Sequence, residues 1–456
     1  MELMKKHKLH ILVPVILVAL SLVGSMLYAL IRSSFSAQSH VSLGRQYLNE
    51  LDYASAVLEF SNAIQLDPTD LDARIGLAET YAQSGSYDFA VEVLESAQDQ
   101  DGLEPELAQA LIQIHEDAGR PGAAIRVIGE LIDRTDDEAC YTQMNQAMEK
   151  LYSIPRTYAI GTDQELCISG GVLSRGSNTL GQLGTDQNLG RRQAVQEAFQ
   201  PSGFPGKALS VCCAGRTSCV IDEDHNLWAA GENRWGQMGL AYSTALPEDG
   251  WVKLTDTGDV AAVAGGNGTL ALLKLDGSLW ACGSGIGQKP VRSAAFPHVL
   301  RIAWDNGTYY VLNRNGRLYS ASSLTETAGA YCLAEDVIDF TAADGRVYWL
   351  RADGALGSSY GFNAPSGWTW DNSFCKPDLQ IRTLAANGSC LVFWLQDGTL
   401  KQLDENGLLS EVPASGAVTA LFTEKSHIVA ALADGSVLCW PPRESAPRTG
   451  LPEYGG

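Results

Sequence analysis

A short turn motif recurs from Ile154 to the end of the chain, and it constrains the fold more than any other feature of the sequence. Each copy consists of an apolar run, an Asp-Gly pair or its equivalent, and a second apolar run. Asp-Gly and Asn-Gly pairs supply the positive φ angles of tight hairpin turns. In chain order the seven turn positions are Gly170, His225, Gly277, Gly316, Gly354, Gly398 and Gly435.

A second turn precedes the first by nine or ten residues in six of the copies. Two turns at that distance bracket one strand of about six residues, so each unit is predicted to be a small antiparallel meander. Seven such units predict a seven-bladed β-propeller over residues 154–442, followed by a tail at 443–456. Closing the ring removes exposed sheet edges. The second turns lie at Gly215, Asn267, Asn306, Asp344, Asn387 and Lys425.

The first units also carry a longer glycine signature. Residues 176–184 read GSNTLGQLG and residues 231–239 read GENRWGQMG, with Gly236 at the position of the central glycine. This signature is similar to the regulator-of-chromosome-condensation repeat, a family of seven-bladed propellers that bind proteins. The family's best-known member promotes nucleotide exchange on a small nuclear GTPase, and a secreted bacterial branch inhibits β-lactamases. The last four units lack the signature, so the blade count there depends on the turn spacing alone. No insertion matches the family's exchange wedge, and a location outside the cytoplasm argues against a cytosolic GTPase, so no functional residue is carried over from the family.

A different repeat, with a period of 34 residues, precedes the propeller region. Ala56, Ala90 and Ala124 are 34 residues apart. A unit of that length is two antiparallel helices with a small residue where they cross closely. The pattern resembles the tetratricopeptide repeat, and the first copy keeps Leu43, Gly44, Tyr47, Ala56, Phe60, Ala63 and Pro68. We therefore expect helical repeats over residues 37–151, with residues 137–151 as a capping helix.

The resemblance to tetratricopeptide repeats implies a groove that binds peptides or partner helices. Residues 41–150 hold 6 basic and 22 acidic residues, a net charge of −16, which favours basic ligands. Two other interpretations stay open. The acidic residues can form a solvated outer face, and the helices can serve as a spacer.

The N-terminal residues predict a membrane anchor. Residues 11–31 contain no charged side chain, and 21 residues of helix span roughly the 30 Å hydrocarbon core of a bilayer. Lys5, Lys6 and Lys8 precede this run, so the positive-inside rule places residues 1–10 in the cytoplasm and the later residues outside it. A cleaved signal peptide is the alternative interpretation.

Composition and motifs argue against several classes of function. A net charge of −21 disfavours nucleic-acid binding, which depends on Lys and Arg. The ten cysteines form no Cys-x-x-Cys pair, so a zinc ribbon or thioredoxin-like site is disfavoured. We found no phosphate loop, zinc-protease motif or nucleophile elbow. The sequence therefore predicts no catalytic residue, no metal ligand and no cofactor.

Aromatic residues expected in loops are the candidates for protein binding, because tryptophan and tyrosine are enriched at binding hot spots. The alternative is that they pack between blades. The candidates are Trp235, Tyr360, Phe362, Trp368 and Trp370.

Together these features predict a multi-domain protein with a transmembrane helix, an α-helical repeat array and an all-β propeller. We expect a non-enzymatic, single-pass membrane protein that displays two protein-binding modules outside the cytoplasm. Three alternatives stay open: an inhibitor or regulator of cell-wall or β-lactamase-type enzymes, a GTPase exchange factor if the propeller is cytoplasmic, and a hydrolase with paired carboxylates in the propeller funnel.

Overall fold

The computed structural model describes residues 37–440 and Val23, apart from gaps at 102, 187–188, 190–194, 241–249, 327, 360–368, 372–373, 378 and 426. Within this part of the chain, no helix has both the length and the apolar character needed to cross a membrane. The span expected at 11–31 lies outside the described residues, apart from Val23. The internal contacts divide the chain into two compact units, Met1–Ile114 and His115–Gly456.

The first unit consists of antiparallel helices, as the 34-residue period predicts. A helix over residues 37–49 precedes α2 (Tyr53–Leu66), α3 (Leu71–Gln83) and α4 (Tyr87–Asp101), and α5 (Pro105–Asp117) begins in this unit. Asp52 and Asp70 cap α2 and α3 by accepting hydrogen bonds from backbone N–H groups of the first turn.

Small and large apolar residues alternate in the core of the first unit. Ala56 and Ala90 are fully buried, as the repeat predicts. The ring of Phe60 fills the space beside Gly44 and Gly76, where an added Cβ atom would lie 3.0 Å and 2.3 Å from it. Residues of the helix 37–49, α2 and α3 therefore form one apolar cluster around Phe60.

The second unit contains two helices and seven sheets. Helices α6 (Pro121–Thr135) and α7 (Glu138–Tyr152) pack against each other. Asp137 caps α7 through the N–H of Ala139, and α7 is the capping helix that the sequence predicts. Ala124 on α6 is fully buried, like its counterparts in the first unit.

The first four sheets follow one another along the chain, and each is an antiparallel meander of four strands. The first contains β1 (Tyr158–Ile160), β2 (Gln164–Ile168), β3 (Val172–Ser177) and β4 (Val195–Pro201). The second contains β5 (Ala208–Ala214), β6 (Thr217–Asp222), β7 (Leu227–Gly231) and β8 (Val252–Lys253). The third contains β9 (Val260–Gly266), β10 (Thr269–Lys274), β11 (Leu279–Gly283) and β12 (Gly287–Arg292). The fourth contains β13 (Val299–Asp305), β14 (Thr308–Asn313), β15 (Leu318–Ala321) and β16 (Ala330–Ala334).

The last three sheets differ in strand number. The fifth has five strands, β17 (Val337–Ala343), β18 (Arg346–Arg351), β19 (Leu356–Ser358), β20 (Thr369–Asp371) and β21 (Phe374–Lys376). The sixth has β22 (Ile381–Ala386), β23 (Cys390–Leu395), β24 (Leu400–Asp404) and β25 (Leu409–Val412). The seventh has three strands among the described residues, β26 (Val418–Glu424), β27 (His427–Leu432) and β28 (Val437–Trp440).

The turn positions confirm the seven-bladed propeller. The glycines Gly277, Gly316, Gly354, Gly398 and Gly435 have φ between 74° and 86°, and His225 takes the same left-handed conformation at φ 59°. In six blades the second strand, bracketed by the two turns, has six residues, as their separation predicts. Gly236 in the longer signature also has positive φ, at 73°.

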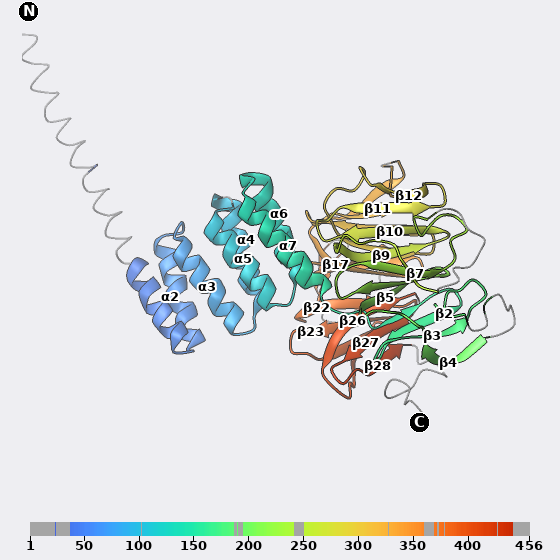
Figure 1. The fold of residues 1–456 in the computed structure, drawn as a ribbon. Coiled ribbons are helices and arrows are strands. Elements are labelled where there is room, and N and C mark those ends of the chain that lie inside the picture. The colour runs from blue at the N-terminus through green and yellow to red at the C-terminus, as the bar shows by residue number, and fades with distance from the viewer. Residues whose placement is uncertain are drawn as a thin grey trace, which may run out of the picture. The chain divides into compact units, whose positions relative to one another are not determined.

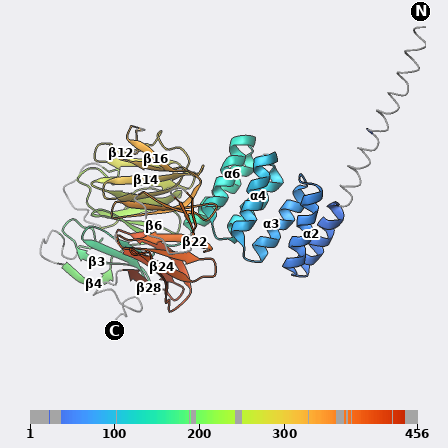
Figure 2. The ribbon, with the colours of Figure 1, turned by 180° about the vertical axis from the view of Figure 1, so that it is seen from behind.

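The sheets form a closed ring (Figures 1 and 2), because the innermost strands of successive sheets contact each other. Apolar clusters lie between neighbouring sheets. The last and first sheets close the ring through a cluster that joins Ala420, Phe422 and Val429 with Tyr158 and Cys167.

Candidate functional site

The structure describes only part of the predicted aromatic set. Trp235 lies in the loop after β7 with 45% of its surface exposed, next to Gly268 of the following blade, and Arg234 stacks on it at 5.4 Å. Trp370 belongs to the short strand β20, so it is not in a loop as the sequence suggested. Tyr360, Phe362 and Trp368 lie outside the described residues. The binding role of all five stays a prediction.

The first unit carries a compact charged face. Arg45, on the helix 37–49, donates to Asp72 of α3 at 3.1 Å, and both side chains are at least half exposed. Glu79 lies two turns further along α3. Burial raises the pKa of Glu79; the charge of Asp72 adds to this effect, while Arg45 opposes it. We call Asp72 and Glu79 the acidic face; the positive charge of Arg45 acts on both of them.

The charge of the helical segment 37–114 in the first unit is almost entirely negative. Residues 37–114 contain 14 Asp and Glu residues but only two arginines, Arg45 and Arg74. Both arginines are engaged within the unit, because Arg45 pairs with Asp72 and buried Arg74 donates to the carbonyl oxygen of Pro68. The unit therefore presents a surplus of carboxylates that its own cations do not neutralise.

In the second unit, α6 approaches the propeller at glycine positions. An added Cβ atom at Gly122 would lie 2.4 Å from the carbonyl oxygen of Ile338 in β17. Ala123 belongs to the apolar cluster between the fifth and sixth sheets. Buried Arg120 donates through Nε to the carbonyl oxygen of Ile381 at 3.0 Å. The last helical pair therefore packs directly against the propeller, within the same compact unit (Figure 1).

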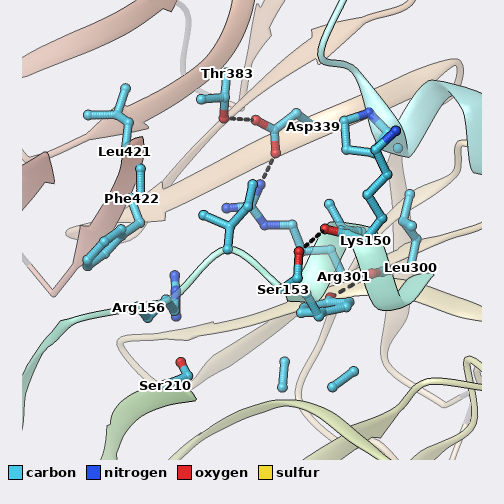
Figure 3. A pocket seen from close by; sticks show the side chains of 18 of the residues that line it. Lys150, Ser153, Arg156, Ser210, Leu300, Arg301, Asp339, Thr383, Leu421 and Phe422 are labelled. Carbon is cyan, nitrogen blue, oxygen red and sulfur yellow. Dashed lines mark hydrogen bonds and ion pairs between the residues drawn. The ribbon is translucent and has the colours of Figure 1, made fainter. Parts of the chain in front are cut away.

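A cavity of about 400 Å³ lies at the end of the propeller channel where the innermost strands begin. The cavity is lined by Glu116 at the end of α5, by residues 119–122 in the turn before α6 and at its start, and by residues 150–152 of α7. The linker 153–156 and strand residues from six sheets complete the lining. Figure 3 shows this arrangement, with Ser153 and Arg156 of the linker facing Arg301, Leu421 and Phe422 of the strands. We call this space the channel cavity.

The strands that line the channel cavity share one irregularity. Each of six innermost strands shifts register at its second residue, which leaves that residue without a cross-strand partner. Such bulges bend a strand and redirect its side chains, and they are common beside binding sites. The unpaired residues are Leu209, Ala261, Leu300, Ile338, Arg382 and Thr419, and all except Thr419 line the cavity.

One ion pair is fixed in the wall of the channel cavity. Arg301 pairs with Asp339, and Asp339 also accepts hydrogen bonds from the Thr383 hydroxyl and the N–H of Phe340 (Figure 3). Burial and, to a lesser extent, the nearby charge of Arg156 lower the pKa of Arg301 to about 10, which still leaves the guanidinium group charged at neutral pH. Tyr152 also lines the cavity, and its hydroxyl group donates to the carbonyl oxygen of Leu300 at 2.7 Å.

Two other arginines of the channel cavity are held differently. Arg382 stacks on the ring of Trp394 at 4.1 Å, and no described carboxylate pairs with it. Arg156 lies over the ring of Phe422 at 5.2 Å, and its nearest carboxylate is Glu424, at 3.7 Å. Burial raises the pKa of Glu424 to about 7 despite the opposing charge of Arg156.

The sequence did not point to the channel cavity, because its residues are spread from Glu116 to Phe422. A usable signal was present in the strand register. The third residue of an innermost strand faces the channel in several blades, as Ser210, Arg301, Asp339 and Thr383 show. Aligning the blades on their turns would have placed these side chains at one level.

Comparisons with known proteins find separate matches for the helical repeats and for the propeller. Residues 48–114 match the family model of the tetratricopeptide repeat. Superkiller protein 3 of Schizosaccharomyces pombe is 28% identical over 129 residues, which is 27% of this chain. The matched segment is only 9% of that protein's length, so this chain spans a small part of that relative.

The propeller is similar to solved structures at low identity. Prp20p from Saccharomyces cerevisiae, studied for its binding to Gsp1p and histones, is 16% identical with a TM-score of 0.49, covering 64% of this chain and 83% of its own. Human WBSCR16 is 16% identical with a TM-score of 0.47, covering 60% and 85%. BamB from Moraxella catarrhalis is 16% identical with a TM-score of 0.36, covering 63% and 82%. The family model thus covers the helical repeats, and the strand order of the structure itself shows the seven-bladed propeller.

Proposed function

We propose that the protein is a non-enzymatic scaffold, and that its first unit holds a partner through a segment rich in lysine and arginine. The observation that carries this proposal is the charge of residues 37–114, which contain 14 carboxylates and only two arginines, both engaged internally. Complementary charge speeds encounter and selects among partners. The acidic face is the preferred contact because Asp72 and Glu79 are two turns apart on α3.

Removing the charge of the acidic face should weaken binding of a basic peptide. We expect Asp72→Asn together with Glu79→Gln to lower the affinity of a fluorescent twelve-residue Lys/Arg-rich peptide about tenfold, since the loss of two charge pairs with the peptide, at about 0.7 kcal/mol each, corresponds to that factor. Fluorescence anisotropy at two salt concentrations measures it, with a weaker salt dependence expected for the variant.

The matched control removes the same charge elsewhere. Glu50→Gln with Glu92→Gln neutralises two exposed carboxylates elsewhere in the same unit, one in the turn after the helix 37–49 and one on α4. This pair should change the affinity less than twofold. Equal weakening by both pairs would show that overall charge, and not the acidic face, attracts the peptide.

We further propose that residues 11–31 anchor the protein in a membrane and that both units lie outside the cytoplasm. The support is the uncharged run of 21 residues and the lysines that precede it. Protease added to intact cells should therefore remove the propeller and the helical unit. Protection of both in intact cells, with cleavage after lysis, would place them in the cytoplasm.

A further inference from the structure

We propose that the channel cavity binds a small organic carboxylate, with the charged group held by arginine and an apolar body packed in the channel. Five cations, Arg120, Lys150, Arg156, Arg301 and Arg382, and two carboxylates, Glu116 and Asp339, line it. The difference of five and two is a charge of +3 inside a chain whose net charge is −21. The cavity therefore has the opposite sign of charge from the chain as a whole. This site is separate from the proposed function, which concerns the first unit.

The partners of the cations show which of them can meet a ligand. Asp339 neutralises Arg301, and Glu116 pairs with Lys150 at 3.1 Å. Arg120 is buried and donates to a backbone carbonyl group. Arg382 and Arg156 remain, the first without a carboxylate partner among the described residues and the second with Glu424 at 3.7 Å.

Both remaining arginines are pre-oriented for binding. The ring of Trp394 supports one flat face of Arg382, and the ring of Phe422 supports Arg156. Stacking of this kind leaves the N–H edges of a guanidinium group available, and those edges match a carboxylate in a two-pronged hydrogen bond. Gly119 allows this position, because an added Cβ atom there would lie 2.7 Å from Nε of Arg382.

The rest of the wall selects the body of the ligand. Leu300, Ile302, Leu421, Phe422 and Ile154 line the same cavity and present apolar surface. A volume of about 400 Å³ is within the range of ordinary small-molecule sites, which combine apolar walls with a few placed polar groups. Because Asp339 and Glu116 are already paired with Arg301 and Lys150, the two remaining guanidinium groups are free to hold one planar carboxylate, and the apolar wall fits its organic body.

Two sources can supply this chemistry: a free organic acid and the C-terminal carboxylate of a peptide. The test uses the full-length protein and isothermal titration calorimetry with hexanoate, phenylacetate and a five-residue peptide ending in leucine. The neutral hexanamide, phenylacetamide and C-terminally amidated peptide are the matched probes. Binding of the free acids supports a metabolite-like ligand, and binding of the peptide alone supports a chain terminus.

Substitutions of the two arginines test whether the carboxylate binds in the channel cavity. Arg382→Gln and Arg156→Gln should each weaken the carboxylate at least tenfold, whereas Arg346→Gln, an exposed arginine on β18, should leave it within twofold. Near-UV circular dichroism verifies folding, and if one variant does not fold the other still decides the question. Failure of every carboxylate to bind, equal binding of the amides, or unchanged affinity in the folded cavity variants would overturn the proposal.

Discussion

Phe60→Ala is expected to lower the free energy of unfolding of the first unit by about 3–5 kcal/mol, the usual cost of removing a fully buried aromatic ring. Phe60 has no exposed surface, and its ring occupies the space beside Gly44 and Gly76. Glycine has no side chain that could move into the vacated volume. The variant therefore leaves a cavity at the crossing of three helices, where the repeat depends on close packing.

Differential scanning calorimetry of the full-length protein measures this effect as a lower transition temperature for the helical unit. Phe89→Ala is the matched control, because Phe89 on α4 is 60% exposed and its ring contacts Tyr81 at 5.8 Å. We expect that control to cost at most about 1 kcal/mol. A loss below about 1 kcal/mol for Phe60→Ala would contradict the packing described for the repeat.

Glu424→Gln is expected to stabilise the second unit at pH 8 and to leave it unchanged near pH 4.5. The carboxyl group of Glu424 faces Arg156 of the linker, Lys425, Cys213 of β5 and the backbone N–H of Ile160. Burial dominates these neighbours and raises the pKa of Glu424 from 4.5 to about 7. The folded protein therefore binds this proton more tightly than the unfolded chain does.

The direction of the pH effect follows from this difference. Between pH 4.5 and 7 the unfolded chain has lost the proton while the folded protein keeps it, so stability falls as pH rises through this window. A shift of this size corresponds to about 3 kcal/mol. Glutamine resembles the protonated carboxyl group, so the variant should lack this loss.

Urea unfolding at pH 4.5, 6 and 8 measures the difference between the variant and the natural protein. Glu411→Gln, on the exposed edge of the sixth sheet, is the control and should follow the natural protein at each pH. Parallel pH dependence of the natural protein and Glu424→Gln would mean that the carboxyl group is not held in its protonated form.

The two repeat folds could be predicted because their signals are local. A left-handed turn requires glycine or a tolerant residue at a fixed position, and Gly277 and Gly316 report this directly in the sequence. A close helix crossing likewise requires a small residue, which Ala56 and Ala90 supply. His225 shows that the turn spacing was more informative than the glycine itself.

The channel cavity could not be predicted in the same way. Arg301, Asp339 and Arg382 come from different blades, and only closure of the ring brings them to one level. The bulges that redirect these strands leave no signature in composition. The extra strand β20 in the fifth sheet was also missed, because a three-residue strand has too little alternation to detect.

Site-specific photo-cross-linking tests the central claim, that the acidic face holds a basic segment of a partner, most directly. A benzophenone amino acid is placed at position 75, between Asp72 and Glu79 on α3, or, as the control, at position 92 of the full-length protein, and cross-linked peptides are identified by mass spectrometry after irradiation in cells. We predict capture from position 75 but not from position 92, with the cross-linked partner peptide rich in lysine and arginine. Equal capture from both positions, or capture of a segment without excess basic charge, would contradict the account.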